Sequence, residues 1–343
     1  MLVLGVFQVN SRFMEYQSVL SIAPLRISFL GGGSDIDYFY TNHPGKVISA
    51  AINKYVYVHI KRHDPLFQER YRISYSEVEH TQSRSEIKNS IVKACLEYLK
   101  IDEPLQISTS ADLPTSSGLG SSSSFTVALL LGLHKMTGKN VSDAQIAEEA
   151  CNIEIQILGN PIGKQDQYAA AFGGLNYYEF QSDGTVKIQP LMMGENNSAK
   201  LMENSLLFWT GETRNDNKVL SDQARNYRDN EINLISMTKL VDEFKSTLLN
   251  SNSELSQLGS LITSGWKLKQ TFSRLINTSE TEDIINEILK NNCVGYKLLG
   301  AGAGGFVYAL FNEKNSVSET FSSKWRTFKP ELDTLGARIV SSF

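Results

Sequence analysis

The 343-residue chain is longer than the about 250–300 residues over which one hydrophobic core usually grows, so its length suits two domains. Its composition, 41% hydrophobic and 20% charged residues, is that of an ordinary soluble globular protein. The formal net charge of −4 leaves no basic excess for nucleic acid, and no stretch reaches the about 20 apolar residues that span a bilayer.

The amino-terminal residues Met1 to Phe7 are apolar, but they lack a charged lead and a small-residue cleavage site. We therefore expect no secretory signal, and Met14 is an alternative start. The three cysteines, Cys95, Cys151 and Cys293, lie far apart and lack the spacing of a disulfide framework or a zinc site. We expect them to be reduced and buried in a cytoplasmic protein.

The first predicted element is a strand over 23–30, which ends at the triplet Gly31, Gly32 and Gly33. One or two glycines would satisfy a turn that needs positive φ, so the third suggests that something packs closely against this backbone. Arg26 within the apolar strand and Asp35 after the turn are either surface charges or functional groups.

Two β-rich runs over 47–52 and 55–60 follow, separated by Asn53-Lys54, and predict a hairpin. Residues 87–99 have helical periodicity, and 105–109 predict a strand that leads toward a run of glycine and serine.

The run from Leu113 to Ser124 has the features of an anion site at the start of a helix. Gly118 and Gly120 can take positive φ, and the serines leave unpaired N–H groups and hydroxyls where the apolar helix begins. A helix amino terminus favours polyphosphate without any lysine. The alternative is a loop that only caps a buried helix.

The pattern Ser142-Asp-Ala-Gln predicts a capped helix, which stops at Gly159-Asn160-Pro161. Glu154 lies beside its apolar stripe, either as a solvated margin or as a functional carboxylate. Asp166 follows in Gly163-Lys-Gln-Asp, where it is either an N-cap or a catalytic carboxylate at a helix start.

The polar stretch 184–199 marks the predicted boundary between an amino-terminal domain over 14–195 and a carboxy-terminal domain over 196–343. Within the second domain, the pattern is helical over 217–250 and again over 255–276.

A third glycine cluster runs from Lys297 to Phe306, and Gly300, Gly302 and Gly305 satisfy the Gly-x-Gly-x-x-Gly pattern. A dinucleotide fold needs a helix after these glycines, whereas a β-rich run follows here. A nicotinamide-dependent oxidoreductase is therefore not expected, and no Walker A sequence is present.

Together the three clusters resemble, in order, the three motifs of the GHMP-type small-molecule kinases, which include galactokinase, homoserine kinase and mevalonate kinase. The resemblance covers nearly the whole chain from about Ser21. It implies an α+β fold with an amino-terminal domain like domain 2 of ribosomal protein S5 and a ferredoxin-like carboxy-terminal domain. Residues alone support only a mixed α and β chain with a boundary near its middle.

The resemblance also assigns roles residue by residue, with ATP and Mg²⁺ as cofactors. Ser122 and Glu154 match the metal ligands, Asp166 matches the proposed base and Arg26 its basic neighbour. The positions that match the ATP-phosphate loop are Pro114, Ser116, Ser117, Gly118, Leu119, Gly120, Ser121, Ser122 and Ser123. The expected acceptor site comprises Arg26, Gly31, Gly32, Gly33, Ser34, Asp35, Gly163, Lys164, Asp166, Arg214 and Gly302.

Galactose-specific members carry Gly-Glu-His where this chain has Gly31-Gly32-Gly33, so a carboxylate and an imidazole are missing. This loss should admit a larger or anionic acceptor. The motifs look most like those of the D-glycero-α-D-manno-heptose 7-phosphate kinases, a branch that phosphorylates the anomeric hydroxyl on the route to GDP-heptose and surface polysaccharide.

The candidate cations for the 7-phosphate are Lys164, Arg214, Lys267 and Lys269. Alternatives are an L-fucose or galactose kinase of the same superfamily, or a noncatalytic ATP- or sugar-binding protein. The expected partner is a small sugar phosphate, with no nucleic acid and no membrane, and a homodimer is compatible with the sequence.

Overall fold

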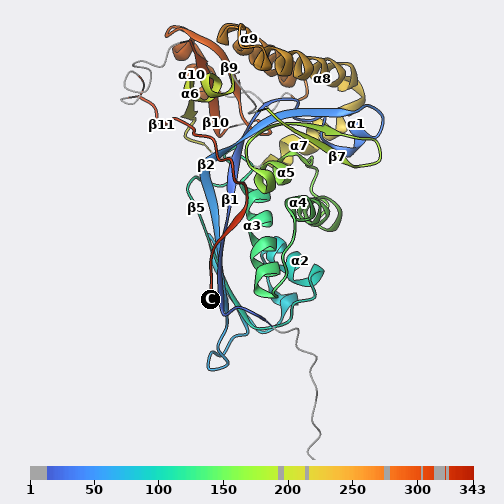
Figure 1. Cartoon of the computed structure of the whole chain (residues 1–343), viewed down its shortest axis with the longest axis vertical. Helices are drawn as coiled ribbons and strands as arrows, with labels where there is room; N and C mark the ends of the chain where they lie inside the picture. Colours follow the sequence, from blue (N-terminus) through green and yellow to red (C-terminus); the bar gives the residue numbers. More distant parts are fainter. Residues whose placement is uncertain are drawn as a thin grey trace, which may run out of the picture.

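The computed structural model describes residues 14–191, 197–212, 216–273, 279–302, 304–312, 321 and 324–343. These residues build an elongated molecule with one sheet along its length and a second, smaller sheet at one end (Figure 1). Among the described residues, no helix is both long and apolar enough to cross a bilayer.

The larger sheet has the strand order β12-β1-β2-β5-β3-β4, and β6 and β7 extend it from one part of β2. Its strands are β1 (Ser18–Leu30), β2 (Gly45–Arg62), β3 (Tyr71–Ser74), β4 (Val78–Thr81), β5 (Leu105–Ala111), β6 (Leu175–Phe180), β7 (Val186–Pro190) and β12 (Arg338–Ser342). The strands predicted over 23–30 and 105–109 are confirmed as parts of β1 and β5.

The hairpin predicted around Asn53-Lys54 is wrong, because β2 is one continuous strand of 18 residues. Its register with β1 jumps at this point: Pro24 lies opposite Tyr55 while Leu25 lies opposite Ile52. Asn53 and Lys54 are therefore extra residues that bulge out of the ladder. Asn-Lys lacks the glycine that a tight two-residue turn requires, and the neighbouring strand keeps both halves of β2 paired.

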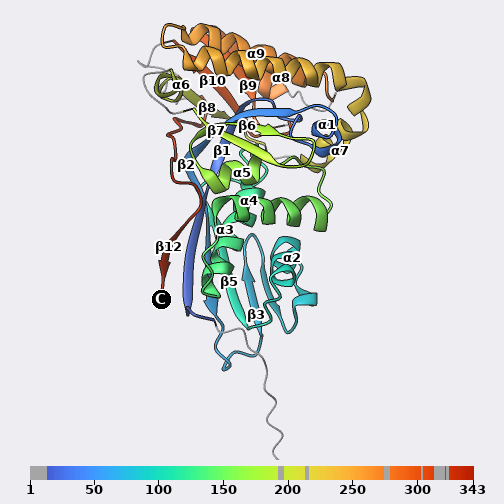
Figure 2. The same cartoon turned by 45° about the vertical axis from the view of Figure 1, so that its right-hand side comes forward.

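Helices cover one face of the larger sheet (Figure 2). They are α2 (Ser90–Tyr98), α3 (Ser121–Met136), α4 (Asp143–Cys151), the π-helical turn Asn152–Ile157 and α5 (Gln165–Phe172). This part of the chain also contains the short α1 (Asp37–Tyr40) and a 3₁₀ turn (Arg84–Glu86). The predicted start of α4 is confirmed, since the Ser142 hydroxyl accepts the Gln145 N–H at 3.2 Å.

The smaller sheet is antiparallel, with the order β11-β8-β10-β9. Its strands are β8 (Ser205–Trp209), β9 (Cys293–Leu298), β10 (Phe306–Phe311) and β11 (Thr327–Phe328), and its helices are α6 (Ser198–Glu203), α7 (Asp216–Arg225), α8 (Tyr227–Leu249), α9 (Leu255–Gln270) and α10 (Ser279–Leu289). Helices α8 and α9 lie side by side (Figures 1 and 2). The helix predicted over 217–250 divides at Asn226 into α7 and α8, and the one predicted from 255 ends at Gln270.

The two sheets are joined through Phe29, near the end of β1. Its ring packs 6.0 Å from that of Phe244 on α8 and 5.4 Å from that of Tyr308 on β10. The last strand, β12, crosses back to pair with β1, so the carboxy terminus lies at the edge of the larger sheet (Figure 1). A division of the chain at about residue 195 remains a prediction.

The three cysteines are unpaired, and Cys95 and Cys151 are buried as predicted. Cys293 is only half-buried, contrary to expectation. It begins β9, which is an edge strand of the smaller sheet, so on one side no strand from the described part of the chain covers it.

Candidate active site

A cavity of about 830 Å³ lies where the two halves of the molecule meet. The end of β1, the start of α3, the π-helical turn and the start of α5 contribute to its walls from the larger sheet's half. Helix α9, strand β9 and the loop after β9 contribute from the other half. The three glycine clusters of the sequence therefore converge on one cavity.

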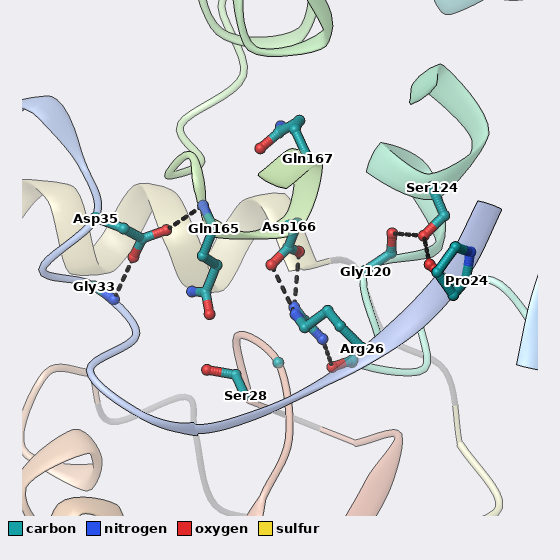
Figure 3. Close-up of polar contacts among 12 residues, drawn as sticks. Pro24, Arg26, Ser28, Gly33, Asp35, Gly120, Ser124, Gln165, Asp166 and Gln167 are labelled. Atoms are coloured by element: carbon teal, nitrogen blue, oxygen red, sulfur yellow. Dashed lines mark hydrogen bonds and ion pairs between the residues drawn. The ribbon is translucent and has the colours of Figure 1, made fainter. Parts of the chain in front are cut away.

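The glycine- and serine-rich loop is attached to the open edge of β1. Strand β12 pairs with β1 only as far as Ile22, and beyond this residue the loop forms hydrogen bonds with the same edge of β1. The Arg26 N–H donates to the Leu119 carbonyl at 3.0 Å, and the Ser124 hydroxyl donates to the Pro24 carbonyl at 2.7 Å (Figure 3). Leu119 itself is fully buried, so the loop is anchored from both sides.

Helix α3 begins at this loop in a way that suits an anion. Its N-cap, Gly120, takes φ +78° and provides no side-chain cap. The first N–H groups of the helix therefore have no internal acceptor, and the positive end of the helix dipole faces the cavity that Ser121, Ser122 and Ser123 help to line. This geometry supports an anion site over a loop that merely caps the helix.

The third glycine cluster packs directly against this loop. Gly118 and Gly300 both have positive φ, and a Cβ built on Gly118 would lie 2.5 Å from the Leu299 carbonyl oxygen. A Cβ on Gly300 would lie 2.4 Å from the Gly118 Cα, and one on Gly305 would lie 2.3 Å from the Ser117 carbonyl oxygen. Close backbone contact explains these glycines, and a strand follows them rather than the helix of a dinucleotide site.

Arg26 and Asp166 form a two-point ion pair in the cavity wall. The guanidinium donates from Nε and Nη2 to the two Asp166 oxygens, each at 2.7 Å, and from Nη1 to the Gly118 carbonyl at 2.6 Å (Figure 3). Arg26 is 5% exposed, whereas the Asp166 side chain is 23% exposed and faces the cavity. Asp166 lies in the first turn of α5 and does not cap it, since Lys164 occupies the N-cap position.

Asp35 is a second, more deeply buried carboxylate. It accepts the Gly33 N–H at 2.9 Å and the Gln165 N–H at 3.1 Å (Figure 3). Burial raises the pKa of Asp35, the Gly33 hydrogen bond lowers it, and the charge of nearby Asp166 raises it further. A Cβ on Gly163 would lie 2.0 Å from an Asp35 oxygen, so only glycine fits there.

Glu154 is a fully buried carboxylate behind the start of α3. It lies in the π-helical turn, accepts the Ser122 hydroxyl at 2.8 Å and accepts the Gln167 amide at 2.7 Å. Burial raises the pKa of Glu154, while the hydrogen bonds from serine and glutamine side chains lower it. Ser122 and Gln167 are both neutral, so a cation would relieve the cost of the buried negative charge.

Ser122 and Glu154 fit a magnesium ion because a hydroxyl and a carboxylate are hard oxygen donors. Within the described part of the chain, no group of three or more histidine, cysteine, aspartate or glutamate residues could hold a metal ion. A site with two protein ligands suits Mg²⁺, which commonly keeps waters and takes oxygens from substrate phosphates.

The glycine triplet contains two different kinds of glycine. Gly31 and Gly33 take φ +97° and +104°, and a Cβ on Gly31 would lie 1.9 Å from the Lys46 carbonyl oxygen. Gly32 has no positive φ, and its Cβ would approach only the ends of side chains. The close packing against backbone that the triplet predicts thus applies to Gly31, whereas a Cβ on Gly32 would meet only side-chain atoms, the nearest 3.3 Å away. Ser34 is buried and bonds to the carbonyls of Gly31 and Lys46.

Two ammonium groups reach the cavity from the smaller sheet's half. Lys269, on α9, donates to the Gly300 carbonyl. Lys297, on β9, is buried and donates to the Ser28 and Phe29 carbonyls at 2.7 and 3.0 Å. Burial, together with the positive charges of Lys269 and Arg26, lowers the pKa of Lys297. Sequence reasoning gave Lys297 no role, although it begins the third glycine cluster. A lysine within an otherwise apolar strand was the signal that could have indicated a functional residue.

The remaining sequence candidates lie elsewhere. Lys164 donates to the Gly184 carbonyl at 2.7 Å and lies 3.7 Å from Glu148, and it does not line the cavity. Lys267 is exposed and Gly302 is buried, and neither lines the cavity. Arg214 lies outside the described residues.

Comparison with known proteins identifies both halves. Residues 88–174 match the family described as GHMP kinases N terminal domain, and residues 244–327 match GHMP kinases C terminal. A D-glycero-alpha-D-manno-heptose 7-phosphate kinase of Campylobacter jejuni is 29% identical over 85% of this chain and 89% of its own length. The bifunctional fucokinase/GDP-fucose pyrophosphorylase of Arabidopsis thaliana is 28% identical over 63% of this chain and 21% of its own.

Solved structures share the whole fold. A D-glycero-D-manno-heptose 1-phosphate kinase from Bacteroides thetaiotaomicron superposes with a TM-score of 0.75 at 23% identity, covering 95% of this chain and 99% of that one. A Lactococcus lactis galactokinase complexed with galactose gives 0.71 at 16% identity, covering 94% and 95%. The matches to both GHMP kinase domain families agree with the convergence of the three motifs on one cavity, and the chain belongs to the GHMP kinases.

Proposed function

We propose that this protein is an ATP-dependent sugar kinase that phosphorylates the anomeric hydroxyl of D-glycero-α-D-manno-heptose 7-phosphate to give the 1,7-bisphosphate. The observation that carries the proposal is the Asp166 carboxylate, held at two points by Arg26 and facing the cavity beside the start of α3. An acceptor hydroxyl at Asp166 would lie next to an anion site suited to the ATP phosphates.

In this proposal, Asp166 accepts the proton of the anomeric hydroxyl as its oxygen attacks the γ-phosphorus and ADP leaves. Arg26 holds the Asp166 carboxylate in place through hydrogen bonds to both of its oxygens. The anomeric hydroxyl is the most acidic on a sugar, which reduces the demand on the base. Because phosphoryl transfer has a loose transition state, positioning and charge neutralisation supply most of the catalysis.

The ATP phosphates are proposed to bind at the start of α3, through the N–H groups and hydroxyls of the glycine- and serine-rich loop from Pro114 to Ser123. Ser122 and Glu154 would hold Mg²⁺, which neutralises charge on the phosphates when bound. Asp35 would contact a sugar hydroxyl, since its two protein donors leave further acceptor positions on the carboxylate.

Two observations favour a phosphorylated heptose. Gly32 lines the cavity without a side chain, and a Cβ there would lie 3.9 Å from the Lys269 ammonium nitrogen. The Campylobacter relative and the Bacteroides structure are both named as heptose phosphate kinases, although the names differ in the position of the phosphate. The product would serve GDP-heptose and surface polysaccharide synthesis.

The second candidate is an L-fucose or galactose kinase, favoured by the fucokinase relative and the galactokinase structure. ADP release with Mg-ATP and a panel of heptose 7-phosphate, galactose, L-fucose and mannose separates the two. We expect turnover only with the heptose phosphate. Turnover only with a free sugar would replace this proposal with the second candidate, and turnover with none of the four would favour a noncatalytic binding protein.

A further inference from the structure

The space at Gly32 has an unusual lining for a sugar site. A Cβ built there would lie 3.3 Å from the Gln165 amide nitrogen, 3.7 Å from the Ser28 hydroxyl oxygen and 3.9 Å from the Lys269 ammonium nitrogen. All three neighbours are hydrogen-bond donors at these atoms. A small anion beside Gly32 would therefore meet several donors. The backbone at Gly32 does not have a positive φ, so it would also accept a residue with a side chain.

The Ser28 hydroxyl provides a second, independent sign of a ligand. Ser28 is 6% exposed and lines the cavity, and its Oγ has no hydrogen-bond partner among the residues that the structure describes. An unpaired buried hydroxyl is costly, so a partner from the ligand would complete it. In Figure 3, Ser28 and Gln165 lie between Asp35 and Arg26, which is where the acceptor is proposed to bind.

Carboxylates of Asp35 and Asp166 line the cavity from the larger sheet's half, whereas the charged side chains that line it from the other half are two lysines. The Lys297 ammonium bonds only to two backbone carbonyls, and no carboxylate among the described residues pairs with it. Lys269 is positioned by α9, whose Gly265 lies one turn earlier and packs so closely that a Cβ would come within 2.1 Å of Leu30. Two fixed lysines beside one cavity wall favour a negatively charged group there.

We propose that the phosphate already carried by the acceptor binds in the space at Gly32, held by Lys269 and the Ser28 hydroxyl, and that this subsite selects phosphorylated sugars. The proposal rests on the proposed function, because it places the acceptor next to Asp166. A carboxylate at position 32, as in the Gly-Glu-His pattern of galactose-specific members, would fill the space and pair with Lys269. The carboxylate group would then occupy the place of a phosphate and exclude it.

The rival role for Lys269 is to contact the transferred γ-phosphoryl group, because its partner Gly300 packs on the ATP loop. Acceptor choice separates the two roles. Steady-state kinetics of Lys269→Met with heptose 7-phosphate and with the unphosphorylated heptose should show KM for the phosphorylated sugar raised about 10- to 100-fold, with kcat and KM for ATP nearly unchanged. An equal fall of kcat with both acceptors would overturn the proposal in favour of the rival role.

Two further variants control this experiment. Gly32→Glu should reduce use of the phosphorylated sugar far more than use of the free sugar, whereas Gly32→Ser should have a smaller effect on their ratio. Lys239→Met, on the exposed face of neighbouring α8, removes a matched charge and should change neither KM. An unchanged acceptor ratio in both Lys269→Met and Gly32→Glu would contradict the subsite.

The wild-type protein tests the proposed function separately. If it does not turn over heptose 7-phosphate, that function fails, and the subsite is then decided by titrating inorganic phosphate into protein saturated with a nonhydrolysable ATP analogue. The proposal expects saturable binding that Lys269→Met abolishes and Lys239→Met retains. Binding that is equal in all three proteins, or absent from the wild type, would overturn it.

Discussion

The two walls of the cavity differ in charge, because one holds three carboxylates and the guanidinium of Arg26, whereas the other holds two lysines. All three cavity carboxylates, Asp35, Glu154 and Asp166, come from the larger sheet's half, whereas Lys269 and Lys297 come from the smaller sheet's half. The first wall also holds the helix start that suits the ATP phosphates. The difference suggests a division of labour, in which one wall transfers the phosphoryl group and the other recognises the acceptor's charge.

The largest effect on activity is expected at the wall from the larger sheet's half, which is proposed to transfer the phosphoryl group. Asp166→Asn should lower kcat by about 10² or more, because the variant cannot accept the acceptor's proton, while KM for ATP stays nearly unchanged. Steady-state kinetics checks this, with the exposed Asp183→Asn as the matched control. Near-normal turnover of Asp166→Asn would remove the base role from this residue.

The metal ligands should give the next largest effect. Glu154→Gln keeps the size of the side chain but removes its negative charge and one of its two accepting oxygens, so the Mg²⁺ concentration for half-maximal rate should rise about 10-fold or more. The measurement is the rate against free Mg²⁺ at fixed ATP. A superimposable Mg²⁺ curve would show that the ion binds elsewhere.

The glycine triplet sharpens the comparison, because substitutions at Gly31 and at Gly32 should have different effects: the first on stability and the second on acceptor binding. Gly31→Ala should lower the free energy of unfolding by about 2 kcal/mol or more, owing to its positive φ and the contact with the Lys46 carbonyl. Gly32→Ala should leave stability nearly unchanged and raise KM for the phosphorylated acceptor a few-fold. Urea denaturation and acceptor kinetics test the pair, and equal loss of stability in both would contradict the distinction.

The smallest expected effect concerns pH. Burial raises the folded-state pKa of Glu154 above its ordinary value of 4.5, so the folded protein holds this proton more tightly than the unfolded chain does. Its stabilising contribution is complete below about pH 4.5 and is lost as pH rises through the folded-state pKa. The Tm of metal-free wild type minus that of Glu154→Gln should therefore fall from pH 4.5 upward, and a rising difference would contradict the assignment.

Local sequence patterns predicted the parts of the site that lie on short segments. The loop before α3, the start of α5 at Asp166 and the third glycine cluster each have residues whose spacing reflects their own backbone geometry. The order of the clusters then predicted the family and, through it, the two-domain fold. Arg26 was paired with Asp166 only by the resemblance, because 140 residues separate them.

What sequence reasoning missed depends on contacts between distant elements. Lys297 reaches the carbonyls at the end of β1 across the junction of the two halves, and no local pattern reports that. The continuity of β2 depends on its neighbour β1, which tolerates the bulge at Asn53 and Lys54. Lys164 was a candidate by its loop position and its positive charge, yet an N-cap residue can direct its side chain away from the cavity, as it does here toward Gly184.

The most direct test of the two-wall account is one ratio: kcat/KM for heptose 7-phosphate divided by kcat/KM for the free heptose, measured in wild type, Asp166→Asn and Lys269→Met. The account predicts that Asp166→Asn lowers both values equally and keeps the ratio, whereas Lys269→Met lowers the ratio about 10-fold or more. A ratio that changes in Asp166→Asn, or that stays constant in Lys269→Met, would contradict it.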